Sequence, residues 1–368
     1  MMPNVMMLRS LPLERDSRST RMAQEYERRG FRVTKLVWSR GDPVSDQADT
    51  VVCEAAGGYG RRLRGLAARL RWMIFIVTRM IAYRKRYGIV HAVDFDTAII
   101  GVPLGRILGK TVVYDAFDSI GAILGQGRLG SVMMSLERRW ISAASVVIFP
   151  DPVRLTQYGV ARTPATAIIS NIPDVPDYVP QLSKNHNILR VVYIGTLEAR
   201  HRGLEYIPEI CEALTGRIEF VVGGTGELHQ FFIDKAANIR NLSYIGHQTY
   251  SDALGQMAKA DVMYGPYLLS APAHRYASPN KMYEHLVLAK PLVTNVGTPP
   301  AALVAEAGSG FLFDGTLADL VATFETLDAA ACSAAGTRGR RLWDEKFSTL
   351  RQTQLDDFFH MLNACYGA

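Results

Sequence analysis

The sequence predicts an α/β protein of two domains, each built on a parallel sheet with helices on both faces. Short apolar runs alternate with helical stretches along the whole chain, which is the pattern of sheets made from strand–helix units. The chain has 368 residues, more than a single hydrophobic core usually serves, so two domains are expected. Hydrophobic residues make up 48% and charged residues 21%, as in folded globular proteins.

The first series of strand–helix units starts at the N-terminus, because Met1–Ser10 is too short and wrongly flanked for a signal peptide. We predict strands at Asn4–Leu8, Phe31–Trp38, Ile89–His91, Thr111–Tyr114 and Ser145–Phe149. We predict helices from about Arg18 to Arg29, within Arg61–Arg86, from Asp94 to Leu108 and over Met133–Ala143. Gly30 and Gly109 end two of these helices, since glycine accepts the left-handed conformation at a helix C-terminus.

The second series follows the loop-rich segment Asn171–Asn187, which carries three prolines and little hydrophobic periodicity. We predict strands at Leu189–Ile194, Ile218–Val222, Leu242–Ile245, Val262–Tyr264 and Pro291–Asn295, with helices between them. A last helix covers about Leu350–Cys365. We therefore expect an N-terminal domain over 1–173, a C-terminal domain over 188–349 and a C-terminal helical segment over 350–368.

The segment Ser278–Val293 predicts a loop, a capped helix and a buried strand. Ser278 suits the N-cap and Pro279 the first helical position. The first turn then presents backbone N–H groups and the ammonium group of Lys281, which together suit a phosphate or diphosphate. Glu284 lies one turn further on the same side, where a carboxylate accepts hydrogen bonds from sugar hydroxyls. The alternative is an ordinary amphipathic helix between two strands.

This segment resembles the nucleotide-sugar site of the GT-B glycosyltransferases, in particular the family-4-like "group 1" enzymes. The matching run is S-P-N-K-M-Y-E from Ser278, followed after five residues by K-P-L-V, and other segments of the chain fall in the family's order. The resemblance implies two Rossmann-like domains with a cleft between them and a C-terminal helix that crosses back to the N-terminal domain. It implies that Ser278, Pro279, Asn280 and Lys281 face the donor diphosphate and that Glu284 binds the nucleotide ribose.

Other loops of the second half extend the resemblance. Gly195 ends a strand in a segment that resembles the family's diphosphate loop, which implies a phosphate role for Arg202 first and Arg200 second, opposite Lys281. Gly224 and Thr225 belong to the run G-G-T-G-E, whose glycines allow close approach of the backbone to a ligand, although it is not a full dinucleotide fingerprint.

Three positions of the second half leave alternatives open. His247 lies where the nucleobase rests in relatives, but it is equally consistent with a capping or surface histidine. Thr196 occupies a place where arginine is common in the family. Tyr276 stands eight positions before Glu284, where retaining members have a glutamate, with His274 and Arg275 beside it. The resemblance therefore does not decide between retention and inversion.

The first half is expected to bind the acceptor. The strand at Thr111–Tyr114 ends in two carboxylates, Asp115 and Asp118, in a segment similar to the "vvyDaHE" run of family-4-like enzymes, with Phe117 in place of the histidine. An inverting transferase needs a group that takes the proton of the acceptor hydroxyl, and Asp118 is the first choice. A retaining enzyme would use it only to orient the acceptor. The alternative is an N-cap role for either aspartate.

Four further residues are candidates for the acceptor side. Arg9, Asp16 and Arg18 surround the first strand–helix turn, which contacts acceptor or sugar in relatives, although the Gly-Gly pair of the family is missing there. His91 lies in the preceding strand, where a core histidine is the alternative. No Asp-x-Asp metal pair lies in a donor loop, because Asp94-Phe95-Asp96 belongs to the other half. We expect neither a metal nor a cofactor.

The net charge of +6 and the pI near 9.1 indicate an anionic partner. Nine basic residues and no acidic one lie between Arg61 and Arg86, among apolar residues at helical spacing. The apolar centre, Trp72–Val77, is far shorter than a membrane span. The helix is predicted to lie on an anionic membrane surface, or else to pack on the sheet as an ordinary surface helix. Nucleic-acid binding is disfavoured because no such motif accompanies the charge.

The sequence thus predicts a glycosyltransferase that moves a sugar from a nucleoside diphosphate, UDP first and GDP second, to a glycan or lipid-linked hydroxyl acceptor in polysaccharide or glycolipid assembly. Four scattered cysteines indicate a reducing cytoplasm, and the basic helix indicates the membrane face. Two alternatives stay open. One is a nucleotide-sugar epimerase or a phosphorylase on the same fold, and the other is a catalytically weak nucleotide-binding subunit of a glycan assembly complex.

Overall fold

The computed structural model of the chain describes residues 4–13, 16–41, 49–55, 62–125, 127–163, 165–175 and 188–366. The chain divides into two compact units. The first comprises Met1–Ser170 together with Gln352–Ala368, and the second comprises Asn171–Arg351. The expected join falls at this division, although its residues 176–187 lie outside the described part, as does Arg61 of the basic segment.

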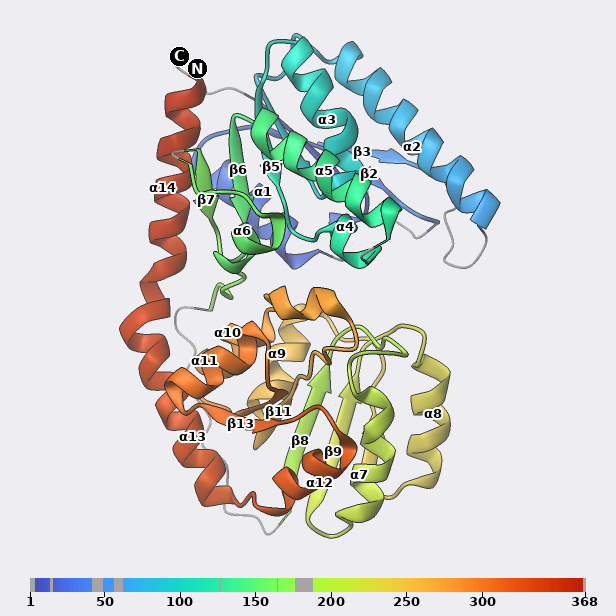
Figure 1. Cartoon of the computed structure of the whole chain (residues 1–368), viewed down its shortest axis with the longest axis vertical. Coiled ribbons are helices and arrows are strands. Elements are labelled where there is room, and N and C mark those ends of the chain that lie inside the picture. Colours follow the sequence, from blue (N-terminus) through green and yellow to red (C-terminus); the bar gives the residue numbers. More distant parts are fainter. Residues whose placement is uncertain are drawn as a thin grey trace. The chain divides into compact units, whose positions relative to one another are not determined.

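A parallel sheet of seven strands, in the order β3-β2-β1-β4-β5-β6-β7, forms the centre of the first unit (Figure 1). The strands are β1 (Val5–Arg9), β2 (Val33–Trp38), β3 (Thr50–Cys53), β4 (Ile89–Val93), β5 (Thr111–Asp115), β6 (Val146–Phe149) and β7 (Thr166–Ile168). The predicted strands are all present. The sequence analysis missed β3 and β7, because these edge strands are short and have no long apolar run.

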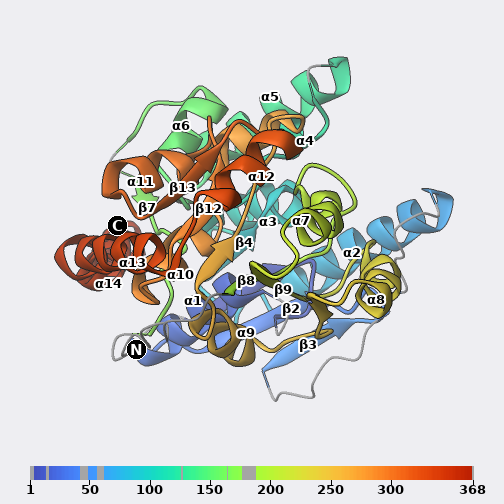
Figure 2. The same cartoon turned by 90° about the horizontal axis from the view of Figure 1, so that it is seen from below.

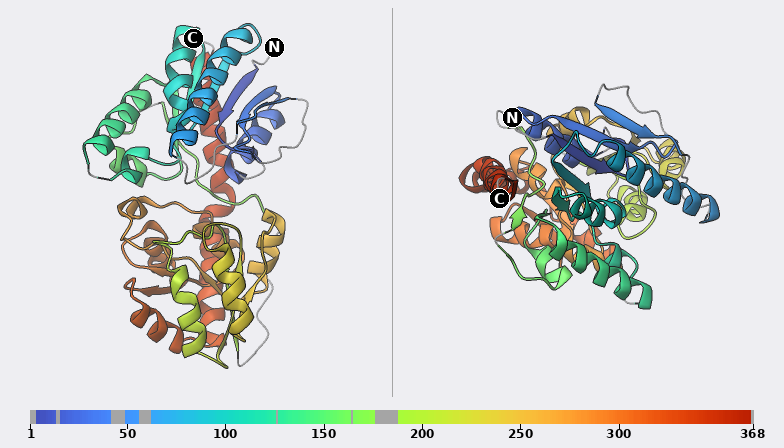
Figure 3. Two further views of the ribbon diagram at one scale, coloured as in Figure 1. Left: turned by 90° about the vertical axis from the view of Figure 1, so that its right-hand side faces the viewer. Right: turned by 90° about the horizontal axis from the view of Figure 1, so that it is seen from above.

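Helices cover both faces of this sheet (Figure 3). One face carries α1 (Ser17–Arg28) and the first-unit part of α14 (Ser348–Tyr366), whose Phe358 and Phe359 pack with Tyr26. The other face carries α2 (Arg62–Ala82), α3 (Phe95–Ile107), α5 (Arg128–Ala143) and α6 (Val153–Tyr158). The short α4 (Ile120–Ile123) contacts α5.

Helix α2 has two apolar stripes and packs on the sheet with one of them. Its buried residues are Ala68, Trp72, Ile76 and Met80. The stripe that contains Leu66, Leu70, Ile74 and Ile81 faces outward, and these side chains are 43–66% exposed. The basic helix therefore has two apolar sides, only one of which the first unit covers.

The second unit contains a parallel sheet of six strands in the order β10-β9-β8-β11-β12-β13. The strands are β8 (Leu189–Ile194), β9 (Ile218–Gly223), β10 (Leu242–Tyr244), β11 (Val262–Tyr264), β12 (Leu292–Asn295) and β13 (Gly310–Phe313). One face is covered by α7 (Ile207–Ala213), α8 (His229–Asn238) and α12 (Leu317–Glu325), with α7 and α12 side by side in Figure 2. The other is covered by α9 (Tyr250–Ala258), α10 (Lys281–Val287) and α11 (Pro299–Ala307), and α13 (Ala329–Leu342) contacts α10.

Helix α10 begins later than predicted. Its N-cap is Asn280, whose carbonyl accepts hydrogen bonds from the N–H groups of Tyr283 and Glu284, both at 2.9 Å. Ser278 is not the cap: its carbonyl accepts a hydrogen bond of 2.7 Å from Asn171 Nδ2, and its side chain is buried. Pro279 accordingly precedes the helix instead of opening it.

Glycines join the loops at the carboxyl ends of β8 and β9. Gly195 N–H donates to the carbonyl of Gly223 at 3.0 Å, and Leu197 N–H donates to the carbonyl of Thr225 at 2.9 Å. Gly224 has a φ of +129°, and a Cβ atom built on it would lie 1.8 Å from the carbonyl oxygen of Gly195. Only glycine permits this contact, so at least part of the glycine run serves loop packing rather than a ligand.

We expect Gly224→Ala to lower the free energy of unfolding by about 3 kcal/mol, because the new methyl group meets backbone that cannot move aside. Gly255→Ala in α9 is the matched control. A Cβ there meets nothing within 4 Å, and alanine favours a helix by about 1 kcal/mol over glycine. Urea unfolding of both variants tests this, and a Gly224→Ala midpoint at or above that of Gly255→Ala would contradict it.

Candidate functional site

The second unit brings Lys281 of α10 to the carboxyl end of β8. Its ammonium group donates a hydrogen bond to the carbonyl of Ile194 and lies 4.6 Å from the centre of the Tyr193 ring. A Cβ atom at Gly195 would lie 3.1 Å from the Lys281 nitrogen, closer than nearly all such contacts. Gly195 therefore leaves room for the cation next to the end of the strand.

The charge of Lys281 lacks a close counter-ion. Burial lowers the pKa of Lys281 to about 8, Glu284 opposes this shift and Arg202 adds to it. Among the described residues no carboxylate lies within salt-bridge distance of the ammonium group. Glu284 is buried one turn along α10 and acts on Lys281 from there. The arrangement favours binding of an anion, since an anion would restore the charged form of the lysine.

Arg202 adds a second cation to the same place. Its guanidinium lies 4.3 Å from the centre of the Tyr267 ring, and its Nε donates to Glu198 Oε2 at 2.9 Å. Tyr264 OH donates to the Gly203 carbonyl at 2.7 Å, which attaches the loop of Arg202 to β11. Arg200, the second choice from sequence, is exposed. The structure thus brings Arg202, but not visibly Arg200, to Lys281.

The remaining donor-side candidates lie at the neighbouring strand ends. Gly224 touches Gly195, and its N–H donates to the Gly246 carbonyl at 2.7 Å, so the loops after β8, β9 and β10 are contiguous. Thr225 is exposed, and so is His247, whose Nδ1 lies 3.1 Å from the Gln248 carbonyl.

The sequence analysis missed Tyr193 and Tyr267, which hold the two cations through their rings. The feature of the sequence that could have identified Tyr193 is its position in a strand, two residues before the glycine turn at Gly195.

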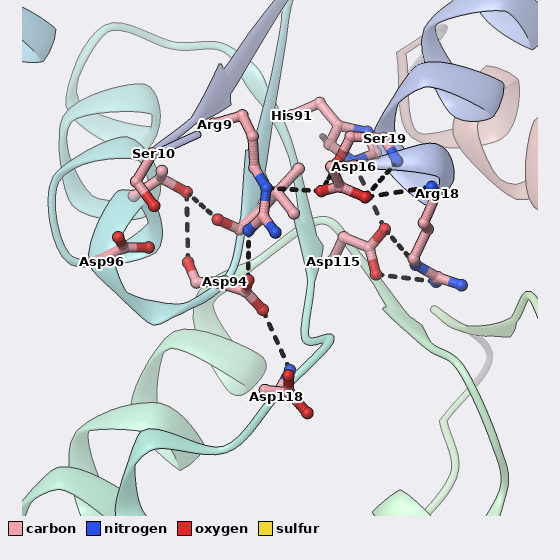
Figure 4. A network of polar contacts seen from close by, with 12 residues as sticks. Arg9, Ser10, Asp16, Arg18, Ser19, His91, Asp94, Asp96, Asp115 and Asp118 are labelled. Carbon is pink, nitrogen blue, oxygen red and sulfur yellow. Dashed lines mark hydrogen bonds and ion pairs between the residues drawn. The ribbon is translucent and has the colours of Figure 1, made fainter. Parts of the chain in front are cut away.

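In the first unit, Arg18 and Asp115 form a buried ion pair with two hydrogen bonds (Figure 4). Arg18 Nε donates to Asp115 Oδ2 at 3.1 Å and Nη2 to Oδ1 at 2.9 Å, while Nη1 donates to the carbonyl of Ile169 at 2.6 Å. Burial alone would raise the pKa of Asp115, but Arg18 and His91 lower it to about 2. A carboxylate with so low a pKa is a weak base. Asp115 is therefore better suited to binding Arg18 than to the catalytic role that the sequence analysis expected.

The other acceptor-side candidates join the same network (Figure 4). Arg9 Nε contacts Asp16 Oδ2 at 2.6 Å, and Arg9 also donates to Asp94. Asp16 is the N-cap of α1 and accepts from the N–H groups of Arg18 and Ser19. His91 is fully buried, and its Nδ1 lies 3.0 Å from the hydroxyl of Tyr26. Arg9, Asp16, Arg18 and His91 are therefore brought together as expected.

Asp118 lies at the edge of this network. Its side chain is 56% exposed and accepts a hydrogen bond of 3.0 Å from Arg154 Nη2. Its backbone N–H donates to Asp94 Oδ1 at 3.0 Å. Neither Asp115 nor Asp118 is an N-cap, because Ser119 caps α4 by accepting from the Ala122 N–H at 3.2 Å. That alternative from the sequence analysis is wrong.

Neither a metal-binding cluster nor a membrane-spanning helix occurs among the described residues. No group of three or more His, Cys, Asp or Glu side chains is placed to hold a metal ion within this part of the chain. Across the same residues, none of the helices combines the length and apolar character that crossing a bilayer requires. The four cysteines are free.

We expect Asp115→Asn to lower the free energy of unfolding by about 3 kcal/mol near pH 7, because Arg18 keeps its charge but loses its partner. The pKa of Asp115 is lowered, so its stabilising effect is present above the unfolded value of 3.8 and is lost as the pH falls towards about 2. In the Asp115→Asn variant the free energy of unfolding should not show this fall at low pH. Asp118→Asn, at an exposed pair, should cost less than about 1 kcal/mol. Denaturant titrations between about pH 7 and pH 3 test this, and equal losses for the two variants would contradict it.

No protein-family model and no curated protein sequence matches the chain. Solved structures do match it over nearly its whole length. Sucrose-phosphate synthase from Thermosynechococcus elongatus gives a TM-score of 0.69 at 13% identity, with 98% of this chain and 99% of that chain covered. Anabaena HepE in complex with UDP and glucose gives 0.68 at 15% identity, with 100% of both chains covered. WaaG, a glycosyltransferase of lipopolysaccharide biosynthesis, gives 0.66 at 14%, with 96% and 98% covered. The predicted fold is confirmed: this chain has the GT-B fold.

Proposed function

We propose that the chain is a glycosyltransferase that moves a sugar from a nucleoside diphosphate to a hydroxyl acceptor. The observation that carries this proposal is the half-buried ammonium group of Lys281, which lies at the carboxyl end of β8 with Arg202 close by and, among the described residues, with no carboxylate within salt-bridge distance. In parallel α/β sheets, ligands bind at this end of the strands. HepE, which shares the fold, was solved in complex with UDP and with UDP-glucose, so UDP is the first choice and GDP the second.

In this proposal the two cations stabilise the diphosphate as the leaving group. Lys281 exchanges the Ile194 carbonyl for a phosphate oxygen, and the lack of a side chain at Gly195 leaves room for the lysine beside the strand end. Glu284 accepts hydrogen bonds from the ribose hydroxyls. The charges come from side chains, so the proposed mechanism requires no metal. The anomeric outcome stays open, because Tyr276 replaces the glutamate of retaining relatives.

We further propose that the acceptor is lipid-linked and that α2 lies on an anionic membrane surface. The exposed stripe of Leu66, Leu70, Ile74 and Ile81 is apolar, and a helix of this kind binds at the boundary of headgroups and acyl chains. Basic residues accompany the stripe, and the described part of α2 has no acidic residue. The basic residues of this segment that are exposed are Arg69 and Arg71 in α2 and Arg84, Lys85 and Arg86 just after it.

Exposed apolar side chains also lie on α4 and α5 of the same unit. Helix α3 contacts both α2 and α5, and α4 contacts α5. Leu129 and Val132 of α5 are 60% and 53% exposed, and Ile123 of α4 is 61% exposed. Exposed apolar residues that gather with basic ones fit a lipid surface better than bulk water.

We expect Lys281→Met to weaken UDP binding by about 10- to 100-fold, because a charge-assisted hydrogen bond to the diphosphate is lost while the side-chain volume is kept. Wild-type affinity should fall as the pH rises above about 8, where Lys281 loses its proton, and the variant should lack this fall. Calorimetric titration with UDP measures both effects. Lys346→Met removes an exposed lysine of the same unit and should bind like the wild type. Equal affinity of Lys281→Met and wild type would refute the donor site.

Transfer itself is tested by product analysis with UDP-sugars and GDP-sugars, with and without a lipid-linked acceptor. The proposal predicts that the sugar appears on the acceptor. Turnover that needs no acceptor would indicate an epimerase instead, and nucleotide binding without any turnover would indicate a binding subunit.

We expect the triple change Leu66→Ser, Leu70→Ser and Ile74→Ser to reduce binding to anionic phosphatidylglycerol vesicles by at least about tenfold, because each lost apolar contact contributes roughly 1 kcal/mol or more. Vesicle flotation measures this. A matched triple change to serine at Ile188, Ile233 and Val296, which are similarly exposed on the second unit, should leave binding unchanged. Equal flotation of the two triple variants would reject the membrane surface.

A further inference from the structure

Asp94 occupies the topological switch point of the first sheet. It directly follows β4, which lies between β1 and β5. Helix α1, after β1, covers one face of the sheet and α3, after β4, covers the other. In open α/β sheets, the crevice between two such strands is where ligands bind. The sequence analysis considered Asp94 only as part of an Asp-x-Asp pair.

The backbone of Asp94 is held in a conformation that suits glycine. Its φ is 64° and its ψ is 168°, a combination that costs a residue with a side chain about 1–3 kcal/mol. Neighbours fix it there: its N–H donates to the Asp115 carbonyl at 3.0 Å, and its own carbonyl accepts from the Ala98 N–H at 3.0 Å. The result is that the Asp94 carboxylate is aimed at Arg9 and at the backbone N–H of Asp118 (Figure 4).

Asp94 shares its arginine with a second carboxylate. The aspartates here are Asp16, Asp94, Asp96, Asp115 and Asp118, and the arginines are Arg9, Arg18, Arg40 and Arg154. Arg18 forms an ion pair with Asp115, and Arg154 forms one with Asp118. Arg40 lies 3.9 Å from Asp96. Arg9 is left to pair with both Asp16 and Asp94.

The pKa of Asp94 reflects this shortage of positive charge. Burial raises it to about 7, Arg9 opposes the shift, and Asp118 and Asp96 add to it. The charge of Asp94 is also felt by the buried phenols Tyr114 and Tyr158.

A separate observation concerns buried polar atoms in the neighbourhood of these carboxylates. Within the part of the chain that the structure describes, His91 Nε2, Tyr114 OH, Arg154 Nε and Tyr158 OH are buried and lack a hydrogen-bond partner. His91 is completely buried, and its Nε2 lies 3.9 Å from Asp115 Oδ2, too far for a hydrogen bond. Buried donors of this kind normally bind an oxygen of protein, water or ligand.

We propose that Asp94 is a catalytic residue that accepts the proton of the acceptor hydroxyl in an inverting transfer, an inference that rests on the proposed transferase function and goes beyond it in the anomeric outcome. The hydroxyl oxygen forms the new bond to the anomeric carbon of the donor sugar while the bond from that carbon to the diphosphate oxygen breaks. The electron pair of the broken bond stays on the diphosphate, and the proton passes to Asp94 and then to water. Asp118, the first choice from sequence, holds Asp94 through its N–H group.

The test uses Asp94→Gly in the full chain, because glycine accepts the backbone conformation of this position and the variant should fold. Loss of the Arg9 ion pair should lower its melting temperature, whereas its UDP affinity should stay that of the wild type. We expect the kcat for transfer to fall by about 100-fold or more, which is the usual contribution of a general base. Added formate, a small carboxylate, should restore the kcat by about tenfold or more by taking the vacated place.

The pH profile provides a second readout. The wild-type kcat should rise with pH through about 7, as Asp94 becomes ionised, and Asp94→Asn should lose this rise. Asp151→Asn is the matched control, since Asp151 follows β6, has a pKa raised by burial and does not contact Arg9. Its kcat and its pH profile should stay those of the wild type.

Three results would overturn the inference. A folded Asp94→Gly variant with a kcat within about tenfold of the wild type would remove the catalytic role. A loss of activity that formate does not restore, together with an unchanged acid limb in Asp94→Asn, would make Asp94 a positioning residue. A wild-type chain that transfers sugar from no donor would overturn the proposed function, and the inference with it.

Discussion

The ammonium group of Lys281, half-buried at the end of β8, is the constraint on which the chemistry of the second unit depends. A cation that is partly withdrawn from water needs a compensating charge, and here it contacts a carbonyl oxygen and an aromatic ring while Glu284 acts from one turn away. The structure tolerates this because Gly195 leaves space beside the strand end and because the loops after β8 and β9 touch through Gly224. We propose that this shortage of negative charge suits the binding of a diphosphate.

At the carboxyl ends of its strands the first unit has more carboxylates than arginines, whereas in the second unit no described carboxylate lies within salt-bridge distance of Lys281. In the first unit the guanidinium groups of Arg9 and Arg18 are bound to aspartates of the chain, and carboxylates exceed the arginines that serve them. The second unit therefore favours an anion, whereas the first favours a ligand that gives up a proton and offers oxygen atoms to buried donors. These are the requirements of a leaving diphosphate and of an acceptor hydroxyl, respectively.

Much of the fold was predictable from the sequence, because buried parallel strands appear as apolar runs and glycines mark helix ends. The edge strands β3, β7 and β13 were not predicted, since each is only three or four residues long and lies at the end of its sheet. For α2, periodicity identified an apolar stripe but not which of its two stripes packs on the sheet. For the site, sequence placed Asp115 and Asp118 at a strand end, but only coordinates show that Arg18 holds the first and that Asp94 lies between Arg9 and the second.

A crystal structure of the full chain with UDP tests the central claim most directly. The account predicts that the diphosphate lies at the carboxyl end of β8, with the Lys281 ammonium group bound to a phosphate oxygen instead of the Ile194 carbonyl and with the Arg202 guanidinium beside it. UDP bound elsewhere, or a Lys281 that keeps its bond to Ile194 while the nucleotide is present, would contradict it.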